Sequence, residues 1–158
     1  MTIDKYHGSY ERCAKIIRKY STIPGLDVAE LFLRIVFSFV IGNSDMHLKS
    51  LSLIEKEEGS NEYCLSEAYD ILPTNIIFPS DEEEMALTLN EKKKNLRKND
   101  FLKFADNVSM NRKSAIKIIA KVVALEDKYI DMCENSYLPC KMKDELENLI
   151  RYRIARLQ

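Results

Sequence analysis

The sequence predicts a mainly helical domain with one small β-hairpin. Apolar residues recur at helical spacing over most of the chain, whereas LSLIEK and EYCLSE are short strand-like runs separated by the polar EEGSN. A chain of 158 residues can bury one hydrophobic core without metals or disulfides. We therefore expect residues 1–158 to form a single domain.

The first predicted helix spans residues 9–20 (SYERCAKIIRKY), and Ser9 is its expected N-cap. Four residues at i, i+3, i+4 and i+7 share one face of this helix: Cys13, Ile16, Ile17 and Tyr20. Such spacing is typical of an amphipathic helix, so this face is expected to pack on the core.

The second predicted helix, VAELFLRIVFSFVI, is apolar almost all the way round. A helix of this kind is usually buried, so we expect it at the centre of the domain. Asp27 precedes it as a candidate N-cap, and Gly42 follows it as the residue that ends it.

The hairpin follows this central helix, with its turn at residues 58–61. Residues 85–89 (MALTL) alternate like a third short strand. The remainder predicts helices: FLKFADNV after Asn99 or Asp100, one long helix opened by Asn111 (RKSAIKIIAKVVALEDKYIDMCEN), and a last one (KMKDELENLIRYRIARLQ) after a break at Leu138-Pro139.

Composition excludes several classes of protein. Basic and acidic side chains number 24 and 25, so no global field favours nucleic acid, and direct binding to it is not expected. The basic run at residues 92–98 follows the acidic SDEEE, and we favour a solvated loop there over a phosphate-binding patch. The longest apolar run, residues 28–41, is too short for a membrane span and carries Glu30 and Arg34. With four scattered cysteines and no signal peptide, a cytoplasmic protein with reduced thiols is expected.

The junction between the central helix and the hairpin concentrates polar side chains. IGNSDMHLKS at residues 41–50 places Asn43, Asp45, His47 and Lys49 within seven positions. A polar loop held between buried elements is a common way to preorganise an active site. The alternative is a solvent-exposed turn in which Asn43 and Asp45 bond local backbone groups.

Asp70 adds a second carboxylate. It lies in SEAYDILPT directly after the second hairpin strand, and the hairpin should fold it back beside the loop that carries Asp45. Two carboxylates brought together in this way suit one catalytic base and one Mg²⁺ ligand.

Both motifs resemble those of the HipA-like kinases. The C-terminal domain of that family carries I-G-N-[ST]-D-x-H-x-K-N, a hairpin and then [AS]-x-Y-D-[IL]-L-x-T, and this chain shows IGNSDMHLKS and EAYDILPT. The similarity covers residues 6–125, including EKKKNLRKNDF, which is similar to the family's G-K-x-x-N-L-x-x-x-D-F element. It implies the helical C-lobe of a protein-kinase-like fold.

The resemblance also implies roles for five residues. Asp45 would accept the proton of the substrate hydroxyl, and Asp70 would hold Mg²⁺ against the phosphates of ATP. Lys49 would neutralise the transferring phosphoryl group in the transition state. His47, at the catalytic side, and Asn43, at the cofactor side, would chiefly brace the loop.

Two departures from the family pattern bear on activity. Ser50 stands where the family has an asparagine that binds a second metal ion, and its shorter side chain weakens that metal position. The 44 residues before Asp45 show no Gly-rich phosphate loop and no strand lysine of a nucleotide-covering N-lobe. Phosphoryl transfer needs both lobes, so we expect the chain to be inactive without an N-lobe.

Two functional hypotheses follow. The first is the C-lobe of a bacterial HipA-like serine/threonine protein kinase, with a protein substrate, an N-lobe in a longer chain or another polypeptide, and a DNA-binding antitoxin partner in a toxin–antitoxin setting. The second is a non-catalytic binding module that contacts an antitoxin or other protein. In either case the lobe interface near residues 51–54 should be open, and we expect dimerisation or partner binding through it.

Overall fold

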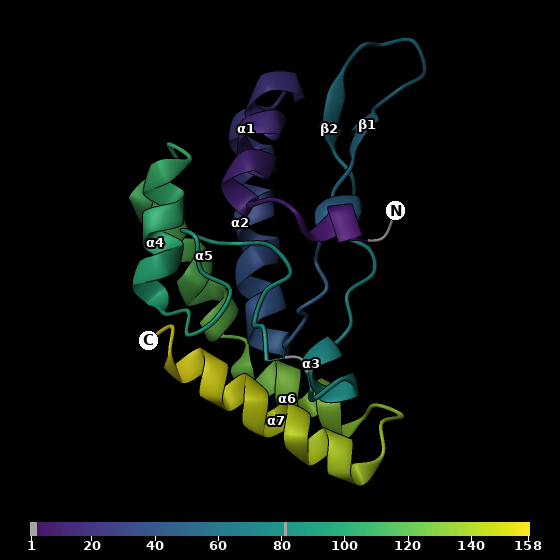
Figure 1. Cartoon of the computed structure of the whole chain (residues 1–158), viewed down its shortest axis with the longest axis vertical. Helices are drawn as coiled ribbons and strands as arrows, with labels where there is room; N and C mark the ends of the chain where they lie inside the picture. Colours follow the sequence, from purple (N-terminus) through teal and green to yellow (C-terminus); the bar gives the residue numbers. More distant parts are fainter. Residues whose placement is uncertain (1–2, 81) are drawn as a thin grey trace.

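Helix α2 (Pro24–Ile41) runs through the centre of the molecule (Figure 1). The computed structural model describes residues 3–80 and 82–158. Helices α1 (Tyr10–Tyr20), α5 (Arg112–Val123) and α7 (Cys140–Ala155) pack against α2. The predicted central helix and the mainly helical fold with one hairpin are confirmed. In the described part of the chain, no helix combines the length and the apolarity that crossing a membrane requires.

The start of α2 differs from the prediction. The helix begins at Pro24, whose fixed φ suits a first helical position, and the preceding residue makes no side-chain cap. The predicted cap at Asp27 is therefore wrong. Its buried carboxylate accepts hydrogen bonds from the Ser21 hydroxyl (2.6 Å) and the Leu65 N–H (2.8 Å), which ties the helix to the hairpin.

Helix α1 has the predicted cap but a different buried face. Ser9 Oγ accepts the Arg12 N–H at 3.2 Å, as expected. Its buried stripe consists of Tyr10, Ala14 and Ile17. Ile16 and Tyr20 are each 52% exposed, so the predicted face is wrong in these two residues. The buried face of α1 begins at Tyr10, one position after the cap. The Tyr10 hydroxyl reaches the loop beyond α2 and donates to the Met46 carbonyl.

The hairpin consists of the antiparallel strands β1 (Leu53–Glu55) and β2 (Tyr63–Leu65), as predicted. Leu53 pairs with Leu65 and Ile54 with Cys64. The hairpin stands beside α1 at one end of the molecule (Figure 1), and β2 also contacts α2.

The strand predicted at residues 85–89 is wrong. Met85, Leu87 and Leu89 are fully buried, yet the described residues form no neighbouring strand beside them. Thr88 makes only an isolated parallel bridge with Ser9. The apolar alternation belongs to a buried segment that bends at Ala86 and Leu87 and forms no sheet.

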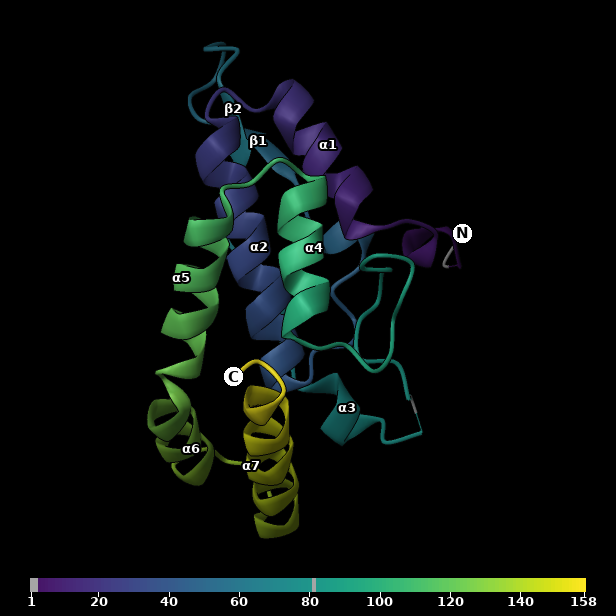
Figure 2. The ribbon, with the colours of Figure 1, turned by 90° about the vertical axis from the view of Figure 1, so that its left-hand side faces the viewer.

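Helices α3 (Thr74–Ile77), α4 (Lys98–Asn107) and α6 (Glu126–Glu134) complete the fold. Asn111 caps α5 as predicted. The expected long helix is instead two helices, because the chain turns after Val123 and α6 packs on α7. Helix α4 starts before the predicted caps, so Asp100 occupies its third position and accepts the Arg97 N–H at 2.9 Å. Helices α4 and α5 lie along α2, and α7 lies near its C-terminal end (Figure 2).

Candidate functional site

Gly42 directs the chain from α2 into the polar loop. Its φ of 74° is in the left-handed region, and the bonds Gly42 N–H to Phe39 O (3.4 Å) and Asn43 N–H to Ser38 O (2.8 Å) form a Schellman motif. A Cβ at position 42 would overlap the Leu149 side chain of α7. The left-handed backbone therefore favours glycine here, and any side chain would also require Leu149 to move.

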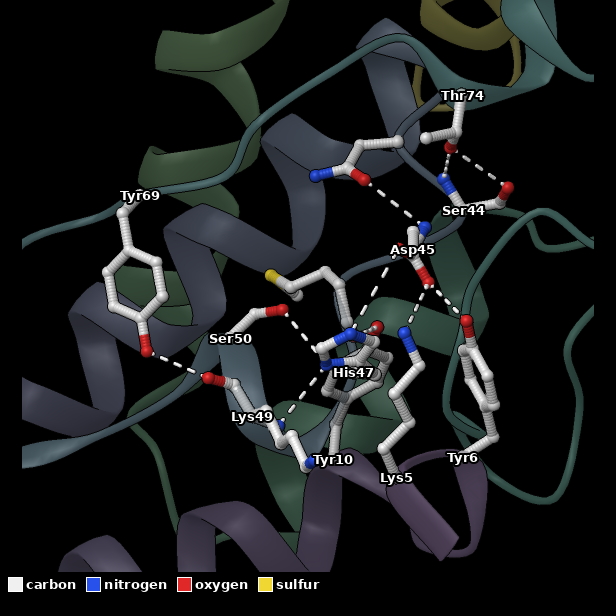
Figure 3. A network of polar contacts seen from close by, with 12 residues as sticks. Lys5, Tyr6, Tyr10, Ser44, Asp45, His47, Lys49, Ser50, Tyr69 and Thr74 are labelled. Carbon is white, nitrogen blue, oxygen red and sulfur yellow. Dashed lines mark hydrogen bonds and ion pairs between the residues drawn. The ribbon is translucent and has the colours of Figure 1, made fainter. Parts of the chain in front are cut away.

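Thr74 joins the two sequence motifs. Its hydroxyl donates to the Gly42 carbonyl (3.3 Å) and accepts the Ser44 N–H (2.7 Å), and it lies 3.0 Å from the Ser44 hydroxyl. The Asn75 N–H also donates to the Gly42 carbonyl at 2.9 Å. The last residue of EAYDILPT thus fixes the first turn of the loop that carries Asp45 (Figure 3).

Tyr69 makes a second connection between the motifs. Its hydroxyl donates to the Lys49 carbonyl at 2.8 Å and lies 3.0 Å from the Ser52 hydroxyl. Asp70 follows directly, with a left-handed φ of 55° and an exposed side chain. The residue before Asp70 is therefore held against the end of the loop.

Asp45 is held by the N-terminal 3₁₀ helix η1 (Ile3–Tyr6). The Tyr6 hydroxyl donates to Asp45 Oδ1 at 2.6 Å, and Lys5 Nζ lies 3.8 Å from the same oxygen. The Tyr6 hydroxyl raises the pKa of Lys5, and so do the Asp45 and Asp70 carboxylates. One ammonium group therefore lies within the field of both predicted carboxylates. The Asp45 side chain remains 40% exposed.

His47 is buried and braces the loop from within. Its Nδ1 accepts the Lys49 N–H at 3.2 Å, which caps the 3₁₀ turn η2 (Leu48–Ser50). The Ser50 hydroxyl lies 3.1 Å from the same nitrogen. Because a backbone N–H can only donate, Nδ1 is the acceptor and the proton of the neutral ring lies on Nε2, 4.0 Å from Asp45 Oδ2.

The other predicted residues lie in different surroundings. Asn43 is 1% exposed, and its Oδ1 accepts the Asp45 N–H at 3.1 Å. Its Nδ2 is buried with no hydrogen-bond partner among the described residues. Lys49 has an exposed side chain. The Ser50 side chain is buried against His47 and does not face solvent.

Two hollows border this site. One has a volume of about 480 Å³ and is lined by Tyr6, Ser44, Asp45, Thr74, Phe78, Glu83 and Lys93. The other, about 680 Å³, lies between α1 and the hairpin, and its apolar lining includes Ile16, Ile17, Leu51, Leu53 and Leu65. Tyr6 borders the first and His7 the second, so both hollows flank the short N-terminal segment.

The basic run beside the site is paired with acidic side chains. Lys93 Nζ lies 2.9 Å from Glu83 and Lys94 Nζ 2.7 Å from Glu82. These ion pairs agree with the solvated, charge-balanced loop expected from the sequence.

Sequence reasoning missed the contribution of Lys5 and Tyr6. Tyr6 and Asp45 are 39 positions apart, and no local pattern links them. The role of Thr74 was also missed, because the Ser44 N–H and the Gly42 carbonyl that it bonds lie 30 and 32 positions away in the sequence.

Comparison with known proteins identifies a family model and relatives that are named as putative kinases. The family model for the HipA-like C-terminal domain matches residues 1–129. A Haemophilus influenzae protein named "Putative kinase" is 27% identical over 165 residues, covering 94% of this chain and 48% of that protein. The Sinorhizobium fredii "Putative kinase Y4dM" is 38% identical over 99 residues, covering 61% of this chain and 24% of the relative. The chain thus spans about half the length, or less, of these curated relatives.

A solved structure shares the fold. A chain from the HipA, HipB and operator DNA complex of the Shewanella oneidensis MR-1 toxin–antitoxin system superposes with a TM-score of 0.73 at 15% identity. The match covers 94% of this chain and 35% of that chain. Family model, relatives and fold agree with the resemblance drawn from the two motifs: the chain belongs to the HipA-like C-terminal domain family.

Proposed function

We propose that this chain forms the catalytic-loop lobe of a serine/threonine protein kinase, which transfers the γ-phosphate of ATP to a protein hydroxyl. The observation that carries the proposal is the double connection between the motifs, through Thr74 to Ser44 and through Tyr69 to Lys49. It joins the segment of Asp70 to the loop of Asp45, and phosphoryl transfer depends on such positioning. A second lobe that covers the nucleotide would complete the site.

Asp45 is our candidate for the base that orients the acceptor hydroxyl. Its Oδ1 is bonded to Tyr6, whereas Oδ2 lies 4.0 Å from His47 Nε2, beyond hydrogen-bonding distance. A carboxylate oxygen can accept further bonds, and the side chain opens on the hollow of about 480 Å³. We infer that an acceptor serine or threonine side chain would approach Asp45 from that side.

The donor set suits Mg²⁺ held jointly by protein and nucleotide. Among the described residues, no group of three or more His, Cys, Asp or Glu side chains could hold a metal ion alone. Mg²⁺ needs only one or two carboxylates, because phosphate oxygens and water complete its shell. When bound, Mg²⁺ would neutralise charge on the phosphates, with Asp70 as its principal ligand.

The remaining predicted residues fit supporting roles. We assign the exposed Lys49 ammonium to the transferring phosphoryl group, and Asn43 and His47 to bracing the loop between the phosphates and Asp45. Ser50 would become the second metal ligand only after its hydroxyl leaves His47, 3.1 Å away. A weak second metal position follows from that arrangement.

Isothermal titration of ATP with Mg²⁺ into the purified chain tests the nucleotide half of this proposal. Asp70→Asn keeps the side-chain volume but removes the charge, so affinity should fall at least about tenfold, or ~1.4 kcal/mol. Asp144→Asn, on the exposed surface of α7, is the matched control and should bind like the wild type. Equal affinities in the wild type and Asp70→Asn would refute the role of Asp70, and no binding to the wild type would refute a preformed nucleotide site.

The second candidate function is a binding module that contacts an antitoxin. It is favoured by the buried Ser50 hydroxyl and by the structural neighbour, which occurs in a complex with HipB and operator DNA. The interface expected near residues 51–54 is part of the hollow beside α1, and Ile54 (46%) and Tyr63 (38%) are exposed on the hairpin. Nucleotide binding that depends on Asp70 would decide against a purely non-catalytic module. Sedimentation velocity at tens of micromolar tests self-association, which a strictly monomeric species would exclude.

A further inference from the structure

Tyr6 reaches Asp45 from the N-terminal 3₁₀ helix η1, which is distant from Asp45 in the sequence. Its hydroxyl donates to Asp45 Oδ1 at 2.6 Å across 39 positions of sequence. This distance is typical of a charge-assisted O–H···O⁻ hydrogen bond, which is about twice as strong as a neutral one. Figure 3 shows the phenol approaching Asp45 from the N-terminal segment while His47 lies on the loop itself.

The Tyr6 ring is itself held on two sides. It forms a T-shaped pair with the His47 ring, with centroids 5.5 Å apart and planes at 79°. The Lys5 ammonium lies 4.7 Å from the Tyr6 ring centroid and also pairs with Asp45. A phenol fixed in this way can restrict the carboxylate that it bonds.

The hydrogen bond from Tyr6 uses only one of the two carboxylate oxygens of Asp45. Tyr6 and Lys5 both contact Oδ1, whereas the nearest ionisable partner of Oδ2 among the described residues is His47 Nε2 at 4.0 Å. The Asp45 side chain is 40% exposed, and Tyr6 lines the hollow of about 480 Å³ without closing it. Access to Asp45 therefore persists with Tyr6 in place, as a positioning residue requires.

We propose that Tyr6 is a positioning residue for Asp45, which fixes the carboxylate through Oδ1 so that Oδ2 faces the acceptor hydroxyl. This inference rests on the proposed kinase function. The hydrogen bond to Asp45 raises the pKa of the Tyr6 phenol, and partial burial raises it further, so the donor proton is retained at neutral pH. The opposite role would be that of a plug, meaning that the Tyr6 hydroxyl occupies the position of the substrate's serine or threonine hydroxyl and blocks it.

Tyr6→Phe removes only the hydroxyl, and Tyr10→Phe is the matched control. The Tyr10 hydroxyl also bonds the loop, but it donates to the Met46 backbone carbonyl at 2.8 Å and not to a reactive group. The first readout needs no catalysis: the three-bond Hα–Hβ couplings of Asp45, measured by NMR on the purified chain. We expect couplings of one χ1 rotamer in the wild type and Tyr10→Phe, and averaged couplings in Tyr6→Phe. Unchanged couplings in Tyr6→Phe, or averaged couplings in the wild type, would overturn the proposal.

The second readout is phosphoryl transfer from [γ-³²P]ATP to a generic acceptor protein, with the nucleotide-covering lobe supplied. The loss of one hydrogen bond to a charged group should lower kcat of Tyr6→Phe about 10- to 100-fold, with KM for ATP unchanged. A faster Tyr6→Phe enzyme would identify a plug and overturn the proposal. If no preparation transfers phosphate, the kinase function fails while the couplings still decide whether Tyr6 fixes Asp45.

Discussion

Replacing Thr74 with valine should destabilise the junction between the two motifs. Valine has nearly the same shape as threonine, so the change removes the hydroxyl and little else. That hydroxyl donates to the Gly42 carbonyl at 3.3 Å, accepts the Ser44 N–H at 2.7 Å and lies 3.0 Å from the Ser44 hydroxyl. The partly buried Ser44 N–H would lose this acceptor, because a methyl group cannot replace it.

The magnitude follows from what each partner retains. The Gly42 carbonyl keeps the Asn75 N–H at 2.9 Å, so only part of its bonding is lost. The bond to the Ser44 N–H is short and has no substitute from valine. With about 0.5–1.5 kcal/mol per net hydrogen bond and more for an unsatisfied donor, Thr74→Val should lower the free energy of unfolding by about 1–3 kcal/mol.

Urea unfolding followed by circular dichroism at 222 nm measures this loss. Thr88→Val is the matched control, because the Thr88 hydroxyl makes a single longer bond to the Gly8 carbonyl at 3.3 Å. It should cost less than about 1 kcal/mol. Equal losses in the two variants, or a loss below about 0.5 kcal/mol in Thr74→Val, would refute the reasoning that Thr74 joins the motifs.

Two further predictions concern buried side chains. Burial lowers the pKa of Arg153 to about 10, and its guanidinium donates to Phe39 O (3.0 Å) and Asn75 Oδ1 (3.3 Å). Arg153→Met should therefore lower the free energy of unfolding, measured in urea, by less than Arg153→Ala does, because methionine fills the volume and carries no charge to desolvate. A larger loss in Arg153→Met would contradict this. Burial raises the pKa of Tyr10 far above its usual value, so the stability that it contributes is complete below pH ~10 and is lost above it, by up to about 1.4 kcal/mol per pH unit. Tyr10→Phe should flatten this alkaline loss in unfolding measured from pH 9 to 11, whereas the fully exposed Tyr137→Phe should not.

The features that the sequence predicted correctly depend on local signals. The apolar run of α2 surrounds its axis, so burial follows from composition alone. Ser9 and Asn111 cap their helices through bonds to residues two or three positions away. Gly42 ends α2 because of its own backbone conformation. Each of these contacts lies within one helical turn of the residue that indicates it.

The errors arise where a distant segment decides the outcome. Asp27 is of a residue type that often caps helices, but its carboxylate accepts the Leu65 N–H, 38 positions away. Residues 85–89 alternate as a strand would, yet an irregular segment buried in a helical core gives the same pattern. The break after Val123 has no glycine or proline to announce it, and it follows from the packing of α6 on α7.

The same distinction applies to the candidate site. The polar loop can be recognised in the sequence because its residues are neighbours, and Asp70 is a candidate because it follows the hairpin. Tyr6 and Lys5 were not predicted, because only the folded chain brings the N-terminal turn onto Asp45. Ser50 was predicted as a metal ligand from its place in the motif, whereas its hydroxyl lies against His47.

Helix α7 shows that the site extends beyond the segment that defines the family. The family model ends at residue 129, but the Leu149 side chain fills the space that a Cβ at Gly42 would need. Arg153 bonds both the end of α2 and Asn75, the residue after the Thr74 connection. A helix outside the matched segment therefore fixes both sides of the junction between the motifs. This support comes from one apolar and one basic side chain of α7, and both lie outside the matched segment.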